Sequence, residues 1–214
     1  MTTAVITGDP IPAAGFSVIC MDPPWNERGG GKIKRGADKH YDLMKTPDIL
    51  AAIIRAEAWR PASDCLLFCW TTMSSLVDAL WLVDGLGFRY VTHGVWVKTK
   101  ADLAGTSLDI GIGQYFRGAH ELFLVASRGS GFAVKTDAKD IPSVILARAP
   151  REDGERVHSR KPPEFFEMVE KRTHGPRLEM FARKSWGPGW TAWGSLEHEP
   201  GTLAADDEAD RDEV

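Results

Sequence analysis

The chain alternates short apolar runs with longer amphipathic stretches. Continuous apolar runs of the kind found in strands buried on both faces occur at 16–21 and 65–70, and further strands are predicted at 88–98, 120–127, 144–149 and 177–182. Between these runs, apolar residues recur at helical spacing over 46–59, 73–86 and 162–173. Strands that alternate with helices predict an α/β fold, with a mainly parallel sheet and helices on both of its faces.

The predicted sheet also indicates where a ligand would bind. In open α/β sheets, ligands occupy the crevice beyond the carboxyl ends of the strands, close to the point where the strand order reverses. This rule selects two stretches of the chain, the residues that follow Met21 and those that follow Arg183. A chain of 214 residues with 43% apolar residues is long enough for one substantial core.

Charge divides the chain into a body and a tail. The formal net charge is −4, but the segment Gly201–Val214 holds six acidic residues against Arg211 alone, so the body, residues 1–200, is near neutral. A near-neutral body is atypical of a nucleic-acid binder, which neutralises phosphates with Lys and Arg. The tail has no large apolar residue between Leu203 and Val214, and we expect residues 201–214 to be a disordered, solubilising segment outside the folded domain.

The cysteines and the N-terminus exclude several classes of protein. Cys20, Cys65 and Cys69 lie inside apolar runs and lack the spacing of a metal site, so they are expected to be buried, reduced thiols, and no metal is expected. No basic region leads into a long apolar stretch, and no run approaches the roughly 20 apolar residues of a membrane span. These features predict a cytoplasmic protein without membrane contact.

The tetrapeptide Asp22-Pro23-Pro24-Trp25 directly follows the first predicted buried strand. From average residue usage it should arise by chance in about one chain in a thousand or fewer. A purely structural interpretation exists, because two prolines can end a strand and an aspartate can form a turn with its own backbone. Its position at the carboxyl end of a strand favours an active-site loop.

Further sequence blocks identify a family. The chain resembles the Asp-Pro-Pro-Trp family of adenine methyltransferases, which includes the catalytic subunit of the eukaryotic messenger-RNA adenosine methyltransferase and many bacterial and phage DNA enzymes. Besides the tetrapeptide, the resemblance rests on 66–70 (LLFCW), 95–99 (VWVKT), 120–125 (HELFLV), 158–162 (HSRKP), 178–183 (LEMFAR), and Gly189-Trp190 with Trp193-Gly194. These blocks cover about residues 16–197 in the order of the family.

The resemblance implies a Rossmann-like class I methyltransferase fold in which the catalytic motif precedes the main cofactor-binding strand. It also implies S-adenosylmethionine as the cofactor and the exocyclic N6 amine of adenine as the methyl acceptor. DNA is the expected substrate, because the chain is compact, has no recognisable RNA-binding module and resembles the bacterial and phage branch. An RNA adenine-N6 methyltransferase, a methyltransferase acting on the cytosine amine, and a catalytically inactive nucleic-acid-binding partner subunit are the alternatives. The intact tetrapeptide argues against the last of these.

The tetrapeptide suits methyl transfer to an aromatic amine. The lone pair of adenine's amine is delocalised into the ring, so a catalyst must localise it on nitrogen. A carboxylate from Asp22 and the carbonyl of Pro23 could each accept one N–H and stabilise the developing positive charge. Pro24 makes the loop rigid, and Trp25 is expected to stack on the base. The target base must be flipped out of a duplex or be single-stranded already.

The resemblance assigns cofactor contacts as well as catalytic ones. It places Cys20 and Asp22 beside the cofactor, Lys161 near cofactor and base, and both Glu179 and Arg183 near the ribose. Ser195 follows the Trp-x-x-Trp-Gly pattern at a position where the family usually has Asn, so one hydrogen-bonding group is lost. Asp9 is a further candidate, as an acid that binds the cofactor's adenine. Family habit makes a homodimer, or a complex with a related subunit, a plausible assembly.

The segment after the tetrapeptide is rich in glycine and basic residues. We interpret it as a mobile flap over the target strand, in which basic side chains meet phosphates and a tyrosine contacts the substrate; the residues are Arg28, Lys32, Lys34, Arg35, Lys39 and Tyr41. An ordinary solvated loop is the alternative. The segment does not match a nucleotide-triphosphate loop, and Gly111-Ile112-Gly113 only half-fits a dinucleotide fingerprint. Trp81, Trp96 and Trp193 are expected to be core residues.

Overall fold

A computed structural model describes residues 4–26, 43–100, 107–111, 115–153, 155–157, 160–182 and 184–195. Eight strands form one sheet in the order β1-β10-β9-β2-β3-β5-β4-β6. Their bounds are β1 Ala4–Gly8, β2 Phe16–Met21, β3 Pro61–Thr71, β4 Arg89–Thr99, β5 His120–Arg128, β6 Val144–Arg148, β9 Arg177–Met180 and β10 Trp190–Ser195. Strands β7 (Arg151–Glu152) and β8 (Glu155–Arg156) pair separately as a short ribbon.

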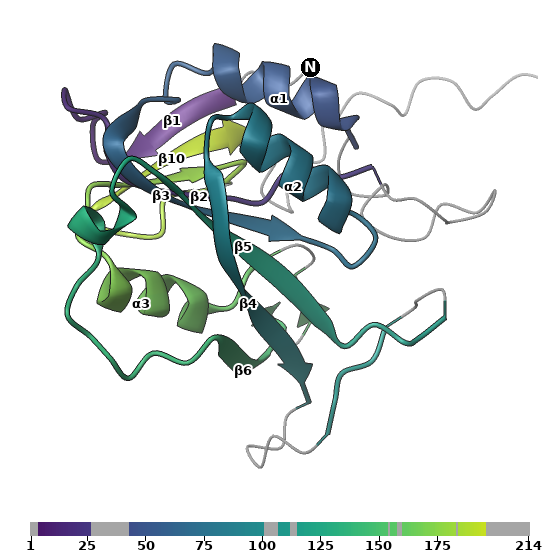
Figure 1. The fold of residues 1–214 in the computed structure, drawn as a ribbon. Helices are drawn as coiled ribbons and strands as arrows, with labels where there is room; N and C mark the ends of the chain where they lie inside the picture. Colours follow the sequence, from purple (N-terminus) through teal and green to yellow (C-terminus); the bar gives the residue numbers. More distant parts are fainter. Residues whose placement is uncertain are drawn as a thin grey trace, which may run out of the picture.

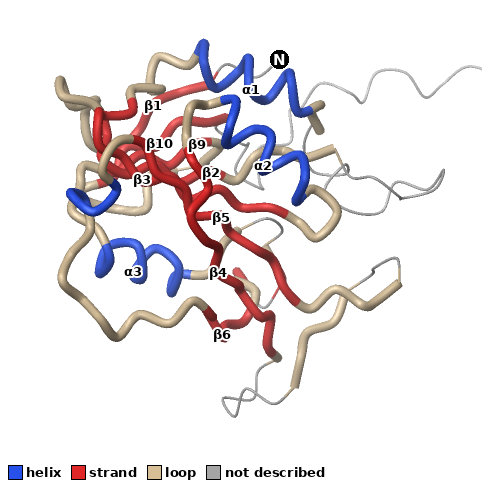
Figure 2. Tube along the Cα trace, viewed as in Figure 1, coloured by secondary structure: helices blue, strands red, loops and turns tan. Residues whose placement is uncertain are grey.

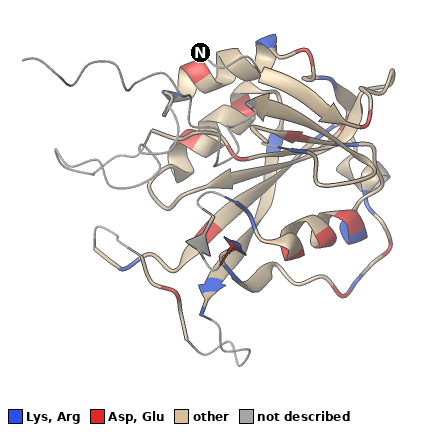
Figure 3. Ribbon diagram, turned by 180° about the vertical axis from the view of Figure 1, so that it is seen from behind, with Lys and Arg blue, Asp and Glu red and all other residues tan. Residues whose placement is uncertain are grey.

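In the described part of the chain, α-helices cover both faces of the sheet, as Figures 1 and 2 show. Helices α1 (Thr46–Arg55) and α2 (Leu76–Gly85) lie on one face, and α3 (Pro163–Arg172) lies on the other. In α3, Glu164 lies in the first turn and Lys171 and Arg172 lie in the last, which matches the helix dipole, and the charged positions can be followed in Figure 3. The predicted α/β fold with helices on both faces is confirmed.

The sheet is mixed, with parallel pairs in the majority. β2 pairs in parallel with both β3 and β9, and β4 pairs in parallel with β6. β5, however, lies antiparallel between β3 and β4. Between β4 and β5 the described residues form no helix, and strands joined without a helical crossover return antiparallel. Edge strand β1 is also antiparallel to its neighbour β10.

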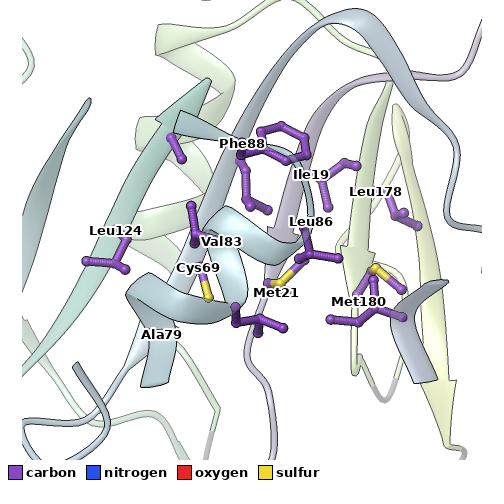
Figure 4. Close-up of a cluster of buried hydrophobic side chains, with 14 of the residues drawn as sticks. Ile19, Met21, Cys69, Ala79, Val83, Leu86, Phe88, Leu124, Leu178 and Met180 are labelled. Carbon is purple, nitrogen blue, oxygen red and sulfur yellow. The ribbon is translucent and has the colours of Figure 1, made fainter. Parts of the chain in front are cut away.

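Two apolar layers follow from the alternation of side chains along the central strands. On β2, Ile19 and Met21 pack with α1 and α2, whereas Val18 and Cys20 pack toward α3. Figure 4 shows the first of these layers, with Ile19 and Met21 close to Val83 of α2. On the second layer, the ring of Trp70 lies 4.7 Å from that of Phe165, measured between centroids. No helix among the described residues is long and apolar enough to cross a membrane.

Candidate active site

The tetrapeptide lies at the carboxyl end of β2, which is a central strand of the sheet. Met21, the last residue of β2, pairs with Cys69 of β3 on one side and with Met180 of β9 on the other. The strand order of the sheet reverses at β2, because β3, its neighbour on one side, follows it directly in sequence, whereas β9, its neighbour on the other side, comes late in the chain. Asp22 therefore emerges at the topological switch point, where α/β sheets bind their ligands.

Hydrogen bonds hold the tetrapeptide in one conformation. The N–H of Trp25 donates to the carbonyl of Pro23 at 2.8 Å, which closes a three-residue turn around Pro24. The N–H of Met44 donates to the carbonyl of Pro24 at 2.9 Å, and Trp25 and Met44 form a β-bridge. A carbonyl oxygen has two lone pairs, so the Pro23 carbonyl retains one acceptor site for another donor. The loop thus presents fixed acceptors at the end of β2.

The side chain of Trp25 is an anchor of this loop. Only 6% of the residue is exposed, and it packs in the apolar layer beneath α1 and α2. Its indole Nε1–H donates to the carbonyl of Trp70 at 2.9 Å. Burial and this hydrogen bond fix the indole in the core, although it also lines the neighbouring cavity, and stacking of Trp25 on the substrate base stays a prediction. The sequence could not distinguish a stacking tryptophan from one that fills the core.

Lys161 brings the start of α3 to the catalytic loop. Its Nζ atom lies 2.6 Å from Oδ2 of Asp22 and 3.2 Å from Oε2 of Glu121, and 5.2 Å from the ring centroid of Trp70. Only 9% of the lysine side chain is exposed. Burial acts to lower the pKa of Lys161, but the two carboxylates outweigh it and raise this pKa above its ordinary value. The group is therefore a fixed ammonium ion that cannot serve as a base near neutral pH.

Asp22 and Glu121 respond differently to their surroundings. Burial raises the pKa of Asp22 above its ordinary value, and the negative charge of Glu121 adds to this while Lys161 opposes it. Burial would also raise the pKa of Glu121, but the ammonium groups of Lys161 and Lys98 lower it to about 2. Glu121 is consequently ionised at every physiological pH. Glu121 therefore acts as a fixed negative charge beside Lys161.

Glu121 and Lys98 are residues to which sequence analysis assigned no role. The Nζ atom of Lys98 lies 2.5 Å from Oε1 of Glu121, and the two side chains are 14% and 20% exposed. Both residues lie in blocks that carry the family resemblance. The strand register brings them together. Trp96 of β4 pairs with Glu121 of β5, and Lys98, two residues after Trp96 on β4, projects from the same face of the sheet as Glu121. That register becomes visible only in the folded sheet.

Glu179 and Cys20 lie side by side on β9 and β2, where they are paired in the sheet register. Cys20 is only 1% exposed and its thiol belongs to the apolar layer facing α3, so only its main chain could contact a ligand. Glu179 is half-buried, and within the described residues no group donates a hydrogen bond to its carboxyl. Burial and the nearby charge of Asp22 raise its pKa to about 8.

Ser195 and Asp9, which were also predicted to bind the cofactor, lie at opposite edges of the sheet. Ser195 ends β10 at the same edge as Asp22, because β10, β9 and β2 run parallel. Asp9 lies at the other edge: the residue before it, Gly8, pairs with Thr191, four residues and roughly 13 Å from Ser195. Its Oδ2 accepts the N–H of Gly189 at 2.9 Å. The carboxylate of Asp9 thus closes a turn on the edge opposite to Asp22, and binding of the cofactor's adenine by Asp9 stays a prediction. Arg183 lies outside the described residues.

The basic flap also lies outside the described residues, including Arg28, Lys32, Lys34, Arg35, Lys39 and Tyr41. Its two ends are described, and the bridge between Trp25 and Met44 brings them together beside the tetrapeptide. The segment therefore starts and ends at the candidate active site. Whether its cations meet phosphates stays a prediction.

A cavity of about 370 Å³ lies next to the loop, on the side of α1 and α2. Its lining includes Asn26, the start of α1 at Thr46, and Ser75 and Trp81 of the α2 region. Trp81 is 50% exposed and was wrongly expected to be a core residue, whereas Trp96 is 2% exposed as expected. The three cysteines are free and buried. In the described part of the chain, no group of three or more His, Cys, Asp or Glu side chains could hold a metal ion.

The fold and this site are those of an α/β methyltransferase with an acidic catalytic loop. The MT-A70 family model matches residues 16–196, and the chain belongs to this family. Family membership makes S-adenosylmethionine the expected methyl donor. The match spans strands β2 to β10, helices α1 to α3 and the residues that contact Asp22 at the end of β2, whereas edge strand β1 lies outside it.

The relatives include bacterial and plant proteins. The chain is 24% identical over 205 residues to the Type II methyltransferase M.MunI of Mycoplasma sp, an alignment that covers 86% of this chain and 78% of that protein. It is 28% identical over 182 residues to a probable N(6)-adenosine-methyltransferase MT-A70-like protein of Oryza sativa subsp. japonica, and 25% identical to an Arabidopsis thaliana N(6)-adenosine-methyltransferase MT-A70-like protein. Each plant alignment covers 84% of this chain but only 23% of the relative.

Proposed function

We propose that this chain transfers a methyl group from S-adenosylmethionine to the exocyclic N6 amine of adenine in DNA. The observation that carries the proposal is the carboxylate of Asp22, held by Lys161 at 2.6 Å at the switch point of the sheet. One oxygen of this carboxylate is engaged by the ammonium, which leaves Oδ1 to accept a hydrogen bond from an N–H of the substrate amine. The free lone pair of the Pro23 carbonyl supplies the second acceptor.

These two acceptors perform the chemistry that the amine requires. Drawing both N–H bonds toward oxygen localises the lone pair on nitrogen and directs it at the electrophilic carbon. The bound cofactor supplies that carbon as a methyl group on a sulfonium sulfur. As the nitrogen–carbon bond forms, the carbon–sulfur bond breaks and its electron pair stays on sulfur. The positive charge that develops on nitrogen is stabilised by Asp22, and the amine then releases a proton to solvent.

The residues around Asp22 suit such a cofactor. Glu179 presents a half-buried carboxyl that receives no hydrogen bond from the described residues, as a partner for a ribose diol would. Asp22 and Glu179 would offer negative charge to the cationic sulfonium of the cofactor, and Lys161 would offer positive charge to the cofactor's carboxylate. Ser195 ends β10 at the same edge. We propose Asp22 and Pro23 as catalytic residues, and Lys161, Glu179 and Ser195 as residues at the cofactor site.

DNA is the substrate favoured by the likeness to a bacterial Type II methyltransferase. The alignment with that protein covers 78% of its length, whereas the alignment with the Oryza sativa relative covers 23%. RNA is the second candidate, and it is favoured by the names of those plant relatives, which specify N(6)-adenosine. The two candidates share the same amine chemistry and differ in the surface that receives the strand.

The test is to incubate the purified chain with labelled S-adenosylmethionine and matched DNA and RNA, and then to identify the modified base. We expect N6-methyladenine in DNA. Asp22→Ala should abolish transfer while cofactor binding is largely kept, and Asp140→Asn is the matched control, because Asp140 also pairs with a lysine, at 2.8 Å, but on the surface. Full-rate transfer by Asp22→Ala would overturn the assigned role, and methyl transfer to RNA alone, or to cytosine, would overturn the substrate.

A further inference from the structure

Four side chains of alternating charge form a continuous row behind the catalytic loop. Lys98 contacts Glu121 at 2.5 Å, Glu121 contacts Lys161 at 3.2 Å, and Lys161 contacts Asp22 at 2.6 Å. Asp22 is the most exposed of the four side chains, at 30%, and Lys161 is the most buried, at 9%. Glu121 and Lys98 are 20% and 14% exposed. The row leads from the candidate catalytic carboxylate into the region between β4 and β5.

The row is built by separate elements that the sheet brings together. Lys98 comes from β4 and Glu121 from β5, which are adjacent antiparallel strands. Lys161 comes from the residues before α3, and Asp22 follows β2. Each of the two lysines also lies over an indole, with Lys98 4.9 Å from the ring centroid of Trp96 and Lys161 5.2 Å from that of Trp70. Trp96 and Trp70 are each 2% exposed and pack edge to face, so both ammonium groups contact indole rings that are fixed in the core.

We propose, on the basis of the proposed function, that Glu121 and Lys98 are positioning residues for methyl transfer: together they fix the Lys161 ammonium so that Asp22 keeps one carboxylate oxygen aimed at the amine. Glu121 shares the Lys161 ammonium with Asp22. Lys98 engages the second oxygen of Glu121 and so fixes the direction of that carboxylate. Neither residue contacts the reacting atoms in this arrangement; both act through Lys161.

A carboxylate at Glu121 is needed for this task, whereas packing alone would not require it. A buried ammonium with a single partner can follow that partner as it moves, but one held between two carboxylates on different elements has a defined place. Charged pairs taken out of water require close partners on every side. Lys98 meets this requirement for Glu121, because the Glu121 carboxylate lies between two ammonium groups.

The row also determines the electrostatic environment of Asp22. The charged and titratable groups that face this carboxyl are Lys161, Glu121, Lys98, Glu179 and Cys69. The negative charge of Glu121 raises the pKa of Asp22, whereas the positive charge of Lys98 lowers it. Removal of either charge therefore shifts the titration of Asp22, and the two shifts have opposite signs. A merely structural role for either residue would give no such pair of shifts.

The experiment compares Glu121→Gln and Lys98→Met with the wild-type chain, using Lys98→Arg as the variant that keeps the charge. Because a misplacement of about 1 Å can cost roughly 100-fold in rate, we expect kcat to fall by about 10- to 100-fold in the first two variants, with KM changed little. The acid limb of the pH–kcat profile should move to lower pH in Glu121→Gln and to higher pH in Lys98→Met. Lys98→Arg should recover most of the rate.

The matched control is Lys171→Met, which breaks an exposed pair with Asp140 and should change neither rate nor profile. Thermal unfolding of every variant shows whether it folds. A carbon-13 NMR titration of Asp22, assigned by its loss in Asp22→Asn, reports the same opposite shifts without any methyl transfer. This measurement separates failure of the row from failure of the proposed function.

Two results would overturn the inference. If Lys98→Met raised KM for DNA in a salt-dependent manner while kcat stayed unchanged, Lys98 would be a phosphate contact. If the Asp22 titration in folded Glu121→Gln and Lys98→Met matched that of the wild-type chain, the row would not act on the catalytic carboxyl.

Discussion

Oδ2 of Asp22 and Nζ of Lys161 lie 2.6 Å apart, although the two residues are far apart in the sequence. Asp22 follows β2, and Lys161 precedes α3. Their contact closes the carboxyl edge of the sheet at its switch point and orients one oxygen of the carboxylate. Because the ammonium is largely buried and in direct contact with the carboxylate, its effect on Asp22 should be measurable in the pH dependence of the reaction.

The first prediction concerns Lys161→Met. Lys161 lowers the pKa of Asp22 against the effect of burial, so loss of the ammonium should raise this pKa further. Asp22 is active as a carboxylate, and the acid limb of the pH–kcat profile should therefore move to higher pH, together with a lower rate on the plateau. An acid limb that stays at the wild-type position in a folded Lys161→Met chain would contradict the pairing.

The second prediction concerns Glu179 and stability. Its pKa is raised from an ordinary 4.5 to about 8, so between these values the folded chain holds a proton that the unfolded chain has released. The free energy of unfolding should therefore fall as pH rises from about 4.5 to about 8. Glu179→Gln, which mimics the protonated acid, should remove this loss.

Thermal unfolding of the cofactor-free protein checks the second prediction. The melting temperature of Glu179→Gln should exceed that of the wild-type chain at pH 8.5 and approach it at pH 4.5. Asp140→Asn, at an exposed carboxylate, serves as the control. A difference between Glu179→Gln and wild type that is independent of pH would show that Glu179 titrates normally.

The third prediction concerns the anchor of the catalytic loop. Trp25→Phe removes the 2.9 Å hydrogen bond to the carbonyl of Trp70 and leaves unfilled space in a layer where the side chain is buried. We expect a loss of about 1–3 kcal/mol in the free energy of unfolding and a lower kcat. Trp81→Phe, at a half-exposed position, should stay within about 0.5 kcal/mol in chemical denaturation. Equal effects of the two substitutions would contradict the anchoring role.

The fourth prediction separates the two edges of the sheet. Asp9→Ala should weaken the turn at Gly189, with a cost of about 1 kcal/mol for the lost hydrogen bond. Its affinity for S-adenosylmethionine in calorimetry should remain within about twofold, since Asp9 lies beyond the amino end of β10. Glu179→Ala, at the carboxyl end of β9, should lose at least about tenfold, which corresponds to one hydrogen bond to an otherwise unpaired group. A large loss of affinity in Asp9→Ala would place the cofactor at the wrong edge for methyl transfer by Asp22.

Most strands could be predicted because continuous apolar runs require burial on both faces. β1 and β10 were not predicted as strands. β1 is a short edge strand whose residues are exposed or only partly buried, and β10 alternates its tryptophans with small residues and includes Gly194. Helix ends also differ, since the pattern continued to Trp59 while α1 ends at Arg55. Local patterns determine which segments are buried, and they do not determine the order in which strands pair.

The candidate site shows the same division. Asp22 could be identified because its tetrapeptide follows a buried run at a strand end. The burial of Trp25 and the place of Asp9 depend on the tertiary packing and on the antiparallel pairing of β1, respectively. Glu121 and Lys98 meet because of the register between β4 and β5, which no periodicity encodes. Residues that act through a neighbour from another strand are therefore the ones that sequence patterns leave unassigned.

The bridge between Trp25 and Met44 joins the two stems of the segment that lies between them in the sequence. Both stems are held by the catalytic loop itself, through the bridge and the hydrogen bond from Met44 to the carbonyl of Pro24. We therefore expect substitutions between the stems to change target preference while they leave the transfer of the methyl group intact.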